Sequence, residues 1–195
     1  MAMAPPEALA RTPVRQRNAE ATRSAILEAA GNRFATECYE DVGMRDIARD
    51  VGVDAAMVAR YFGSKAELFT RVLQSCGSAH ELIAGDRQTF GRRLAQEIVF
   101  GAERTGKLKA LQIILRSLGS AKARDIIRAS TADDFLAPFT GWIGGPEARI
   151  RARLVSGLLM GMAVDRELDG GYGLDTVESV GLCHRLAAAL QAWID

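Results

Sequence analysis

Cysteine and histidine are scarce in this chain of 195 residues. The three cysteines, Cys38, Cys76 and Cys183, are odd in number and far apart, so neither a disulfide framework nor a Cys-x-x-Cys zinc site is predicted. Such usage indicates reduced thiols in a cytoplasmic protein. The two histidines, His80 and His184, lie outside any His-Glu-x-x-His pattern. We therefore expect neither a bound metal nor a cofactor.

Long apolar runs and an excess of one charge are also lacking. The longest apolar run, 154–164, is shorter than the roughly 20 residues of a membrane-spanning helix, and Ser156 interrupts it. The first 13 residues lack the apolar core of a secretory signal. The 25 Lys and Arg residues nearly balance the 24 Asp and Glu residues, which excludes a strongly basic protein of the histone type. This overall balance does not exclude nucleic-acid binding, because a basic surface can be local.

Proline is absent from Val14 to Ala137. Because proline breaks helices, a long proline-free stretch rich in Ala, Leu, Arg and Glu predicts a helical body. No alternating strand pattern flanks an Asn-Gly or Asp-Gly turn. The sequence therefore predicts an all-α protein. We expect helices at 22–37, 44–51, 54–61, 65–83, 90–104, 108–119, 121–130, 135–143, 147–168 and 174–194.

Two short predicted helices, 44–51 and 54–61, meet at Gly52. Glycine can adopt the positive φ that ends the first helix, and Asp54 is a favourable N-cap for the second. Ala48 is small enough for the second helix to cross close to it. This pattern predicts a helix-turn-helix, whose second helix fits a major groove about 12 Å wide. The apolar seam between the two helices would consist of Ile47, Val51 and Val58.

An ordered set of residues surrounds this motif. It consists of Arg23, Ile26, Leu27, Ala29, Ala30, Phe34, Ala35, Tyr39, Glu40, Arg45–Ala48, Gly52, Val53, Arg60–Phe62, Ser64, Lys65 and Leu68. The set resembles the N-terminal domain of the TetR family, the tetracycline-repressor-like transcriptional regulators. The resemblance implies a three-helix DNA-binding domain joined by a long fourth helix to an all-helical C-terminal domain that dimerises and often binds an effector. We expect a flexible basic arm at 1–18, the DNA-binding domain at 19–64 and the effector and dimerisation domain at 65–195.

The resemblance and the local charge together select candidate DNA-binding residues. These are Arg15, Arg17, Gly43, Arg45, Ala55, Ala56, Met57, Ala59, Arg60, Tyr61 and Lys65. Three positions depart from the family pattern: Asp54 and Gly43 replace Ser or Thr, and Ala59 replaces an aromatic residue. The second helix is thus poor in hydrogen-bonding groups. We expect base recognition through thymine methyl groups together with Arg60.

The expected DNA-binding region carries little excess positive charge. Residues 1–72 contain ten Lys and Arg and ten Asp and Glu residues. The region from Arg11 to Arg23 has four arginines against Glu20, a local charge of +3. One interpretation is a basic arm that follows DNA phosphates or enters a minor groove. The alternative is a terminus that is only solvated, and the sequence does not decide between the two. We expect weak DNA binding that depends on the arm.

The C-terminal half carries two apolar stripes. They consist of Ile150, Leu154, Leu158 and Met162, and of Val177, Val180, Leu182, Leu186, Leu190 and Trp193. Two such helices from each of two subunits would form a four-helix dimer face, which would present two reading heads about 34 Å apart. The alternative is that both stripes fill the core of a single subunit.

Candidate effector contacts are less distinct. Phe100, Phe135, Phe139, Trp142 and Met160 would line an apolar cavity and Arg116 would bind an acidic ligand, although aromatic residues at helical spacing also build plain cores. The sequence thus predicts a DNA-binding regulator, a ligand-released repressor that binds a palindromic double-stranded DNA operator as a homodimer through its last two helices. The alternative is an interaction or scaffold protein of TetR-like fold with weakened DNA binding. The sequence contains no recognisable catalytic triad or carboxylate pair, so we do not expect an enzyme.

Overall fold

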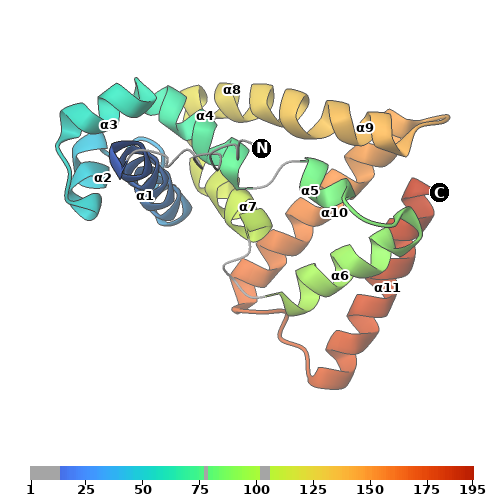
Figure 1. Cartoon of the computed structure of the whole chain (residues 1–195). Helices are drawn as coiled ribbons and strands as arrows, with labels where there is room; N and C mark the ends of the chain where they lie inside the picture. Colours follow the sequence, from blue (N-terminus) through green and yellow to red (C-terminus); the bar gives the residue numbers. More distant parts are fainter. Residues whose placement is uncertain (1–13, 77–78, 102–105) are drawn as a thin grey trace, which may run out of the picture.

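The computed structural model describes residues 14–76, 79–101 and 106–195, and within these ranges it contains helices and no strand (Figure 1). The predicted all-α class is confirmed. The elements are α1 (Val14–Thr36), α2 (Met44–Val51), α3 (Ala55–Phe62), α4 (Lys65–Ser75), α5 (Ala79–Ile83), the 3-10 turn η1 (Arg87–Thr89), α6 (Phe90–Phe100), α7 (Gly106–Ser117), α8 (Ala121–Ser130), the π-helical turn η2 (Thr131–Leu136), α9 (Ala137–Ile143), α10 (Ala148–Asp169) and α11 (Thr176–Ile194).

Helices α1 to α4 enclose the first hydrophobic cluster. At its centre three aromatic rings meet: the Phe69 centroid lies 4.8 Å from that of Phe34 and 4.9 Å from that of Tyr39. All three side chains are buried. Leu68 and Val72 of α4 are also fully buried in this cluster, so α4 is part of the core of the N-terminal head.

Two helices of the C-terminal part extend the same cluster. Ile113 of α7 and Ile127 of α8 are buried in it. Lys109 Nζ donates to Asn32 Oδ1 at 2.8 Å, which ties α7 to α1. Packing is thus continuous across residue 65, the expected domain boundary.

The second cluster is built by α5, α6, α9, α10 and α11. In Figure 1, α6 lies along α11, and the two backbones approach closely: a Cβ at Gly91 would overlap the carbonyl oxygen of Ala187. The rings of Phe90 and Phe139 stack at 5.8 Å, and Trp142 packs against both. This cluster forms a body separate from the head cluster.

The helices differ from prediction at three places. Helix α1 begins at Val14, so residues 14–18 are helical rather than part of an arm; adding residues to an existing helix is favourable even without an apolar stripe. Residues 1–13 of the expected arm lie outside the described residues. The expected helix 65–83 is two helices, since α4 ends at Ser75 and α5 begins at Ala79. The start of the expected helix 135–143 is π-helical.

Candidate nucleic-acid interface and cavity

The turn between α2 and α3 has the predicted geometry. Gly52 adopts φ 73° and ψ 34°, the left-handed conformation that ends α2. The Val53 amide donates to the Ala48 carbonyl at 3.0 Å, and the Asp54 carboxylate caps α3 by accepting from the amide of Ala56 at 2.7 Å. These contacts confirm the predicted helix-turn-helix and its cap.

Helix α3 divides into a buried and an exposed face. Val58 is fully buried, as is Ile47 of α2, while Val51 is half-buried in the seam between them. Six of the candidate DNA-binding residues lie on α3. Four of these six are exposed: Ala56, Met57, Ala59 and Arg60. The other two, Ala55 and Tyr61, are half-buried and pack against the head cluster. The exposed face is thus short, with one cation and otherwise small or apolar side chains.

A bidentate ion pair fixes α2 against α1. Arg33 Nε and Nη2 donate to the two carboxylate oxygens of Asp50 at 2.5 and 2.9 Å, and Nη1 donates to Glu37 at 2.9 Å. The hydrogen bonds from Arg33 lower the pKa of Asp50, and burial opposes this only in part. The same pairing raises the pKa of Arg33. The pair therefore links α2, the helix before the reading helix, to α1 through two charge-assisted hydrogen bonds.

The start of α4 carries a capping box. Ser64 Oγ accepts from the Glu67 amide, and the Glu67 carboxylate accepts from the Ser64 amide at 2.7 Å. This bond lowers the pKa of Glu67. Lys65 does not extend freely: its Nζ donates to the Glu40 carbonyl at 3.1 Å and lies 4.5 Å from the Tyr39 ring centroid. Burial lowers the pKa of Lys65. A phosphate contact by Lys65 would therefore compete with the Glu40 carbonyl.

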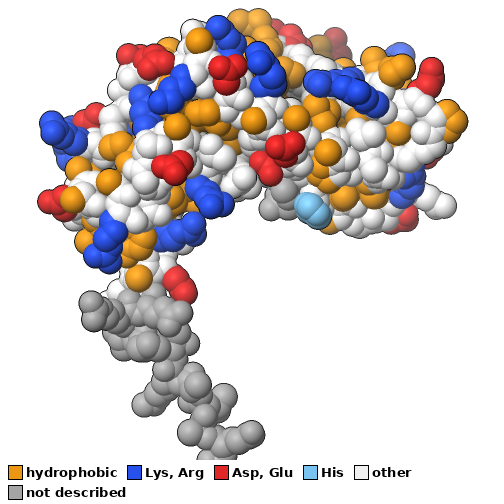
Figure 2. Space-filling view, turned by 90° about the horizontal axis from the view of Figure 1, so that it is seen from above, with side chains coloured by type: hydrophobic (Ala, Val, Ile, Leu, Met, Phe, Trp, Pro, Cys, Tyr) orange, Lys and Arg blue, Asp and Glu red, His pale blue; other side chains and the backbone are white. Residues whose placement is uncertain are grey.

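The other candidate DNA contacts surround α2 and α1. Gly43 is the extended N-cap of α2, and a Cβ there would overlap the Asp46 carboxylate. Arg45 is exposed. Arg15 and Arg17 lie in the first turns of α1. The sequence did not predict one further contact between α1 and α3: the Arg23 guanidinium lies 5.3 Å from the ring centroid of Phe62, at the end of α3. Figure 2 shows acidic and basic side chains interspersed over one face of the molecule.

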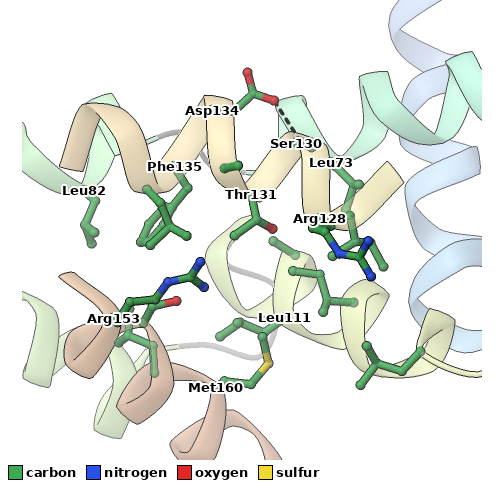
Figure 3. Close-up of a pocket in the computed structure, with 18 of the residues that line it drawn as sticks. Leu73, Leu82, Leu111, Arg128, Ser130, Thr131, Asp134, Phe135, Arg153 and Met160 are labelled. Carbon is green, nitrogen blue, oxygen red and sulfur yellow. Dashed lines mark hydrogen bonds between the residues drawn. The ribbon is translucent and has the colours of Figure 1, made fainter. Parts of the chain in front are cut away.

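A cavity of about 490 Å³ lies between the two hydrophobic clusters (Figure 3). Leu73 and Ile127, which belong to the head cluster, line one part of it. Leu82, Leu94 and Leu136, which belong to the second cluster, line another. Its volume is within the range of about 300–1,000 Å³ that small-molecule sites occupy, and its lining is mostly apolar, as such sites are.

The structure separates the expected effector residues. Phe135 and Met160 line the cavity. Phe139 is fully buried in the second cluster, and Trp142 packs beside it. Phe100 is 54% exposed at the end of α6. Arg116 is exposed on α7, and neither it, Phe100, Phe139 nor Trp142 is among the residues that line this cavity.

Sequence reasoning did not select the polar residues of the cavity wall. Arg153 and Ser156 of α10 and Thr131 of η2 all line it. The signal was present in the spacing: Arg153, Ser156 and Met160 recur at intervals of three and four, and so share one face of α10.

The two C-terminal stripes are each divided between the core and the surface. Leu186 and Leu190 of α11 are buried, and Leu158 and Met162 of α10 pack against the second cluster. Four members stay exposed: Ile150, Leu154, Val177 and Val180. In the described ranges no helix is both long and apolar enough to span a membrane. Nor do His, Cys, Asp and Glu side chains in these ranges form a group that could hold a metal ion.

A helix-turn-helix head with an exposed second helix, joined to a helical body with a cavity between the two, is the architecture of a DNA-binding transcriptional regulator. The chain belongs to the TetR family. Residues 26–72 match the family of bacterial regulatory proteins of tetR type, and residues 88–194 match the tetracyclin repressor-like C-terminal domain. Members are DNA-binding regulators, typically repressors, rather than enzymes.

Solved structures share the fold. NalD of Pseudomonas aeruginosa, the secondary repressor of the MexAB-OprM multidrug efflux pump, is 22% identical with a TM-score of 0.66, and the match covers 89% of this chain and 97% of NalD. A TetR-family regulator of Streptomyces coelicolor is 24% identical with a TM-score of 0.55, and the match covers 94% and 98% of the two chains. No curated protein matches the chain.

Proposed function

We propose that this protein is a ligand-released repressor that binds a palindromic DNA operator as a homodimer in the cytoplasm. The reading residues would be the exposed side chains of α3, with the N-terminal arginines and Tyr61 close to the DNA backbone. A small molecule in the cavity would shift the dimer between a DNA-binding and a released state, which requires that the ligand binds the two states unequally.

The position of the cavity carries this proposal. One part of its wall belongs to the cluster that holds the helix-turn-helix, and the other belongs to the cluster that carries α10 and α11. A ligand that fills the space contacts both bodies at once. Gln74 of α4 also donates to Asp134 of η2 at 3.3 Å, so the cavity wall is bonded to the last helix of the head. A change in this wall would thus change the placement of the head.

The test begins with selection of bound DNA from a random pool, followed by anisotropy titrations of the selected duplex at several salt concentrations. We expect a palindromic site and an affinity that falls steeply with salt, since each phosphate contact contributes about −0.9 to the logarithmic slope. A pool without enrichment, or binding that is insensitive to salt, would contradict the proposal and favour the scaffold protein instead.

The basic N-terminal residues should contribute to this slope. The double substitution Arg15→Gln and Arg17→Gln removes two charges from the start of α1. We expect weaker operator binding and a salt slope that is shallower by about 1 for each lost phosphate contact. The double substitution Arg92→Gln and Arg149→Gln, at exposed positions of α6 and α10, removes the same number of charges from the second cluster and is the matched control for charge alone. Equal slopes for the double variant and this control would show that the arginines lie in a solvated terminus.

A further inference from the structure

The cavity offers its polar groups unevenly. Two carboxylate residues line it. Asp134 accepts from Ser130 at 2.8 Å and from Gln74 at 3.3 Å, and Figure 3 shows its side chain directed away from the cavity. Glu97 is also partnered. Both carboxylates in the wall are therefore already engaged by protein groups.

The arginines in the wall differ in the same way. Arg124 donates to the Leu118 carbonyl at 2.7 Å, and Arg128 pairs with Asp125 at 3.3 Å. Arg153 has no hydrogen-bonding or ion-pairing partner among the described residues. In Figure 3 its guanidinium extends from α10 into the cavity, on the side of Phe135 and Thr131. Because it is exposed, a ligand anion would replace water there rather than a protein partner.

Residues with hydroxyl groups line the same cavity as Arg153. Ser156 lies one turn along α10 from Arg153, on the same face, and Thr131 of η2 lines the opposite wall. The polar groups of the wall thus include an unpartnered cation with a planar fork of donors and two hydroxyls that can donate. Beyond them the wall is formed by aliphatic side chains such as Leu111, Leu159 and Met160.

We propose that the cavity binds an amphipathic carboxylate, an apolar aliphatic or aromatic body with one anionic end, and that Arg153 binds the carboxylate. The guanidinium fork matches the geometry of a carboxylate in a bidentate contact. Ser156 and Thr131 would donate to the remaining lone pairs. The apolar body would fill the space between the two clusters. The proposal rests on the proposed function only in taking this cavity as the effector site.

The test is calorimetric titration of the full chain, without DNA, by three probes of equal chain length and different charge: decanoate, decanamide and decyltrimethylammonium. We expect decanoate to bind about tenfold more tightly than decanamide, the gain typical of a charge-assisted hydrogen bond, and the ammonium compound to bind least. This ratio is measured on the unaltered protein, so it does not depend on the folding of any variant. Equal affinities, a preference for the ammonium compound or no binding of decanoate would overturn the proposal.

Variants then assign the anion contact. We expect Arg153→Gln to weaken decanoate binding about tenfold and to leave decanamide binding unchanged. Arg149→Gln removes an exposed arginine one turn away on α10 that does not line the cavity, and should change neither affinity. Loss of decanoate binding in both variants, or in neither, would overturn the role of Arg153. Operator release is measured separately. Binding of decanoate without release would contradict the repressor mechanism alone, and release by neutral ligands alone would contradict the carboxylate site alone.

Discussion

The glycine in the turn of the helix-turn-helix, Gly52, stabilises the N-terminal head through its positive φ. Gly52 lies at φ 73°, and a Cβ built there meets nothing within 4 Å. The penalty of a side chain is therefore purely conformational. We expect Gly52→Ala to lower the free energy of unfolding by about 1 kcal/mol, the cost of a left-handed L-residue, as measured by urea denaturation. Gly52→Asn is the control, because asparagine tolerates this conformation; equal losses in both variants would contradict the argument.

The Arg33–Asp50 pair gives a prediction with a defined pH dependence. Hydrogen bonds from Arg33 lower the pKa of Asp50 from its ordinary value of 3.8. A carboxylate with a depressed folded pKa contributes stability that is present above the unfolded pKa and is lost as the pH falls through the folded pKa. Asp50→Asn should therefore lower the Tm at about pH 7, and the difference from the unaltered protein should shrink below about pH 4. A Tm difference that stays constant down to about pH 3 would show that the pair contributes through packing alone.

The sequence does not distinguish apolar residues that line the cavity from those that are buried in the core. Phe135 and Phe139 are four positions apart and carry the same side chain, yet Phe135 lines the cavity and Phe139 is fully buried among Phe90 and Trp142. Periodicity identifies apolar positions but not which neighbour covers each one. The difference depends on the packing of α9 against α6, which local sequence does not encode.

At the scale of elements, short helices with clear caps were predicted best. The bounds of α2 and α8 match the prediction, and the predicted cap at Asp54 is confirmed. These signals are local, since a cap requires only a side chain and an amide two or three residues away. The π-helical turn η2 was not predicted: residues 131–134 lie between the expected helices 121–130 and 135–143, where the apolar periodicity is interrupted. It forms part of the cavity wall, where such turns often accompany function.

Helix α3 gives the prediction about DNA reading. Its exposed face offers Met57, two alanines and Arg60, so apolar contacts must supply much of the sequence preference. The thymine methyl group is the apolar feature of the major groove. We expect replacement of operator thymines by uracils to weaken binding, and Arg60→Ala to relax preference at one base pair at a cost of about 1–3 kcal/mol. Thymine-to-uracil changes outside the selected site are the control. Unchanged affinity for the uracil operator would contradict apolar recognition.

At the scale of the whole molecule, the exposed parts of α10 and α11 are the proposed dimer face. Val177 is 81% exposed and Ile150 is 57% exposed, and a Cβ at Gly157 or Gly161 would meet open space. The sequence located both stripes, but it could not separate their buried members from those that face outward, because one helix face contacts both the core and the surface. Apolar side chains in this quantity on two adjacent helices favour contact with a second subunit.

We expect Leu154→Glu and Val180→Glu, each made alone, to shift the protein from dimer to monomer, because a carboxylate in an apolar interface loses its hydration without gaining a partner. Light scattering after gel filtration measures the shift. Since a palindrome is bound by two heads at once, operator affinity should fall toward that of a single half-site. Ala129→Glu, at an exposed position of α8, controls for the added charge. Variants that stay dimeric would place the subunit contact elsewhere. Monomers that still bind decanoate would show that the cavity forms within one subunit. The ligand site and the DNA-binding head would then be coupled within that subunit rather than across the dimer face.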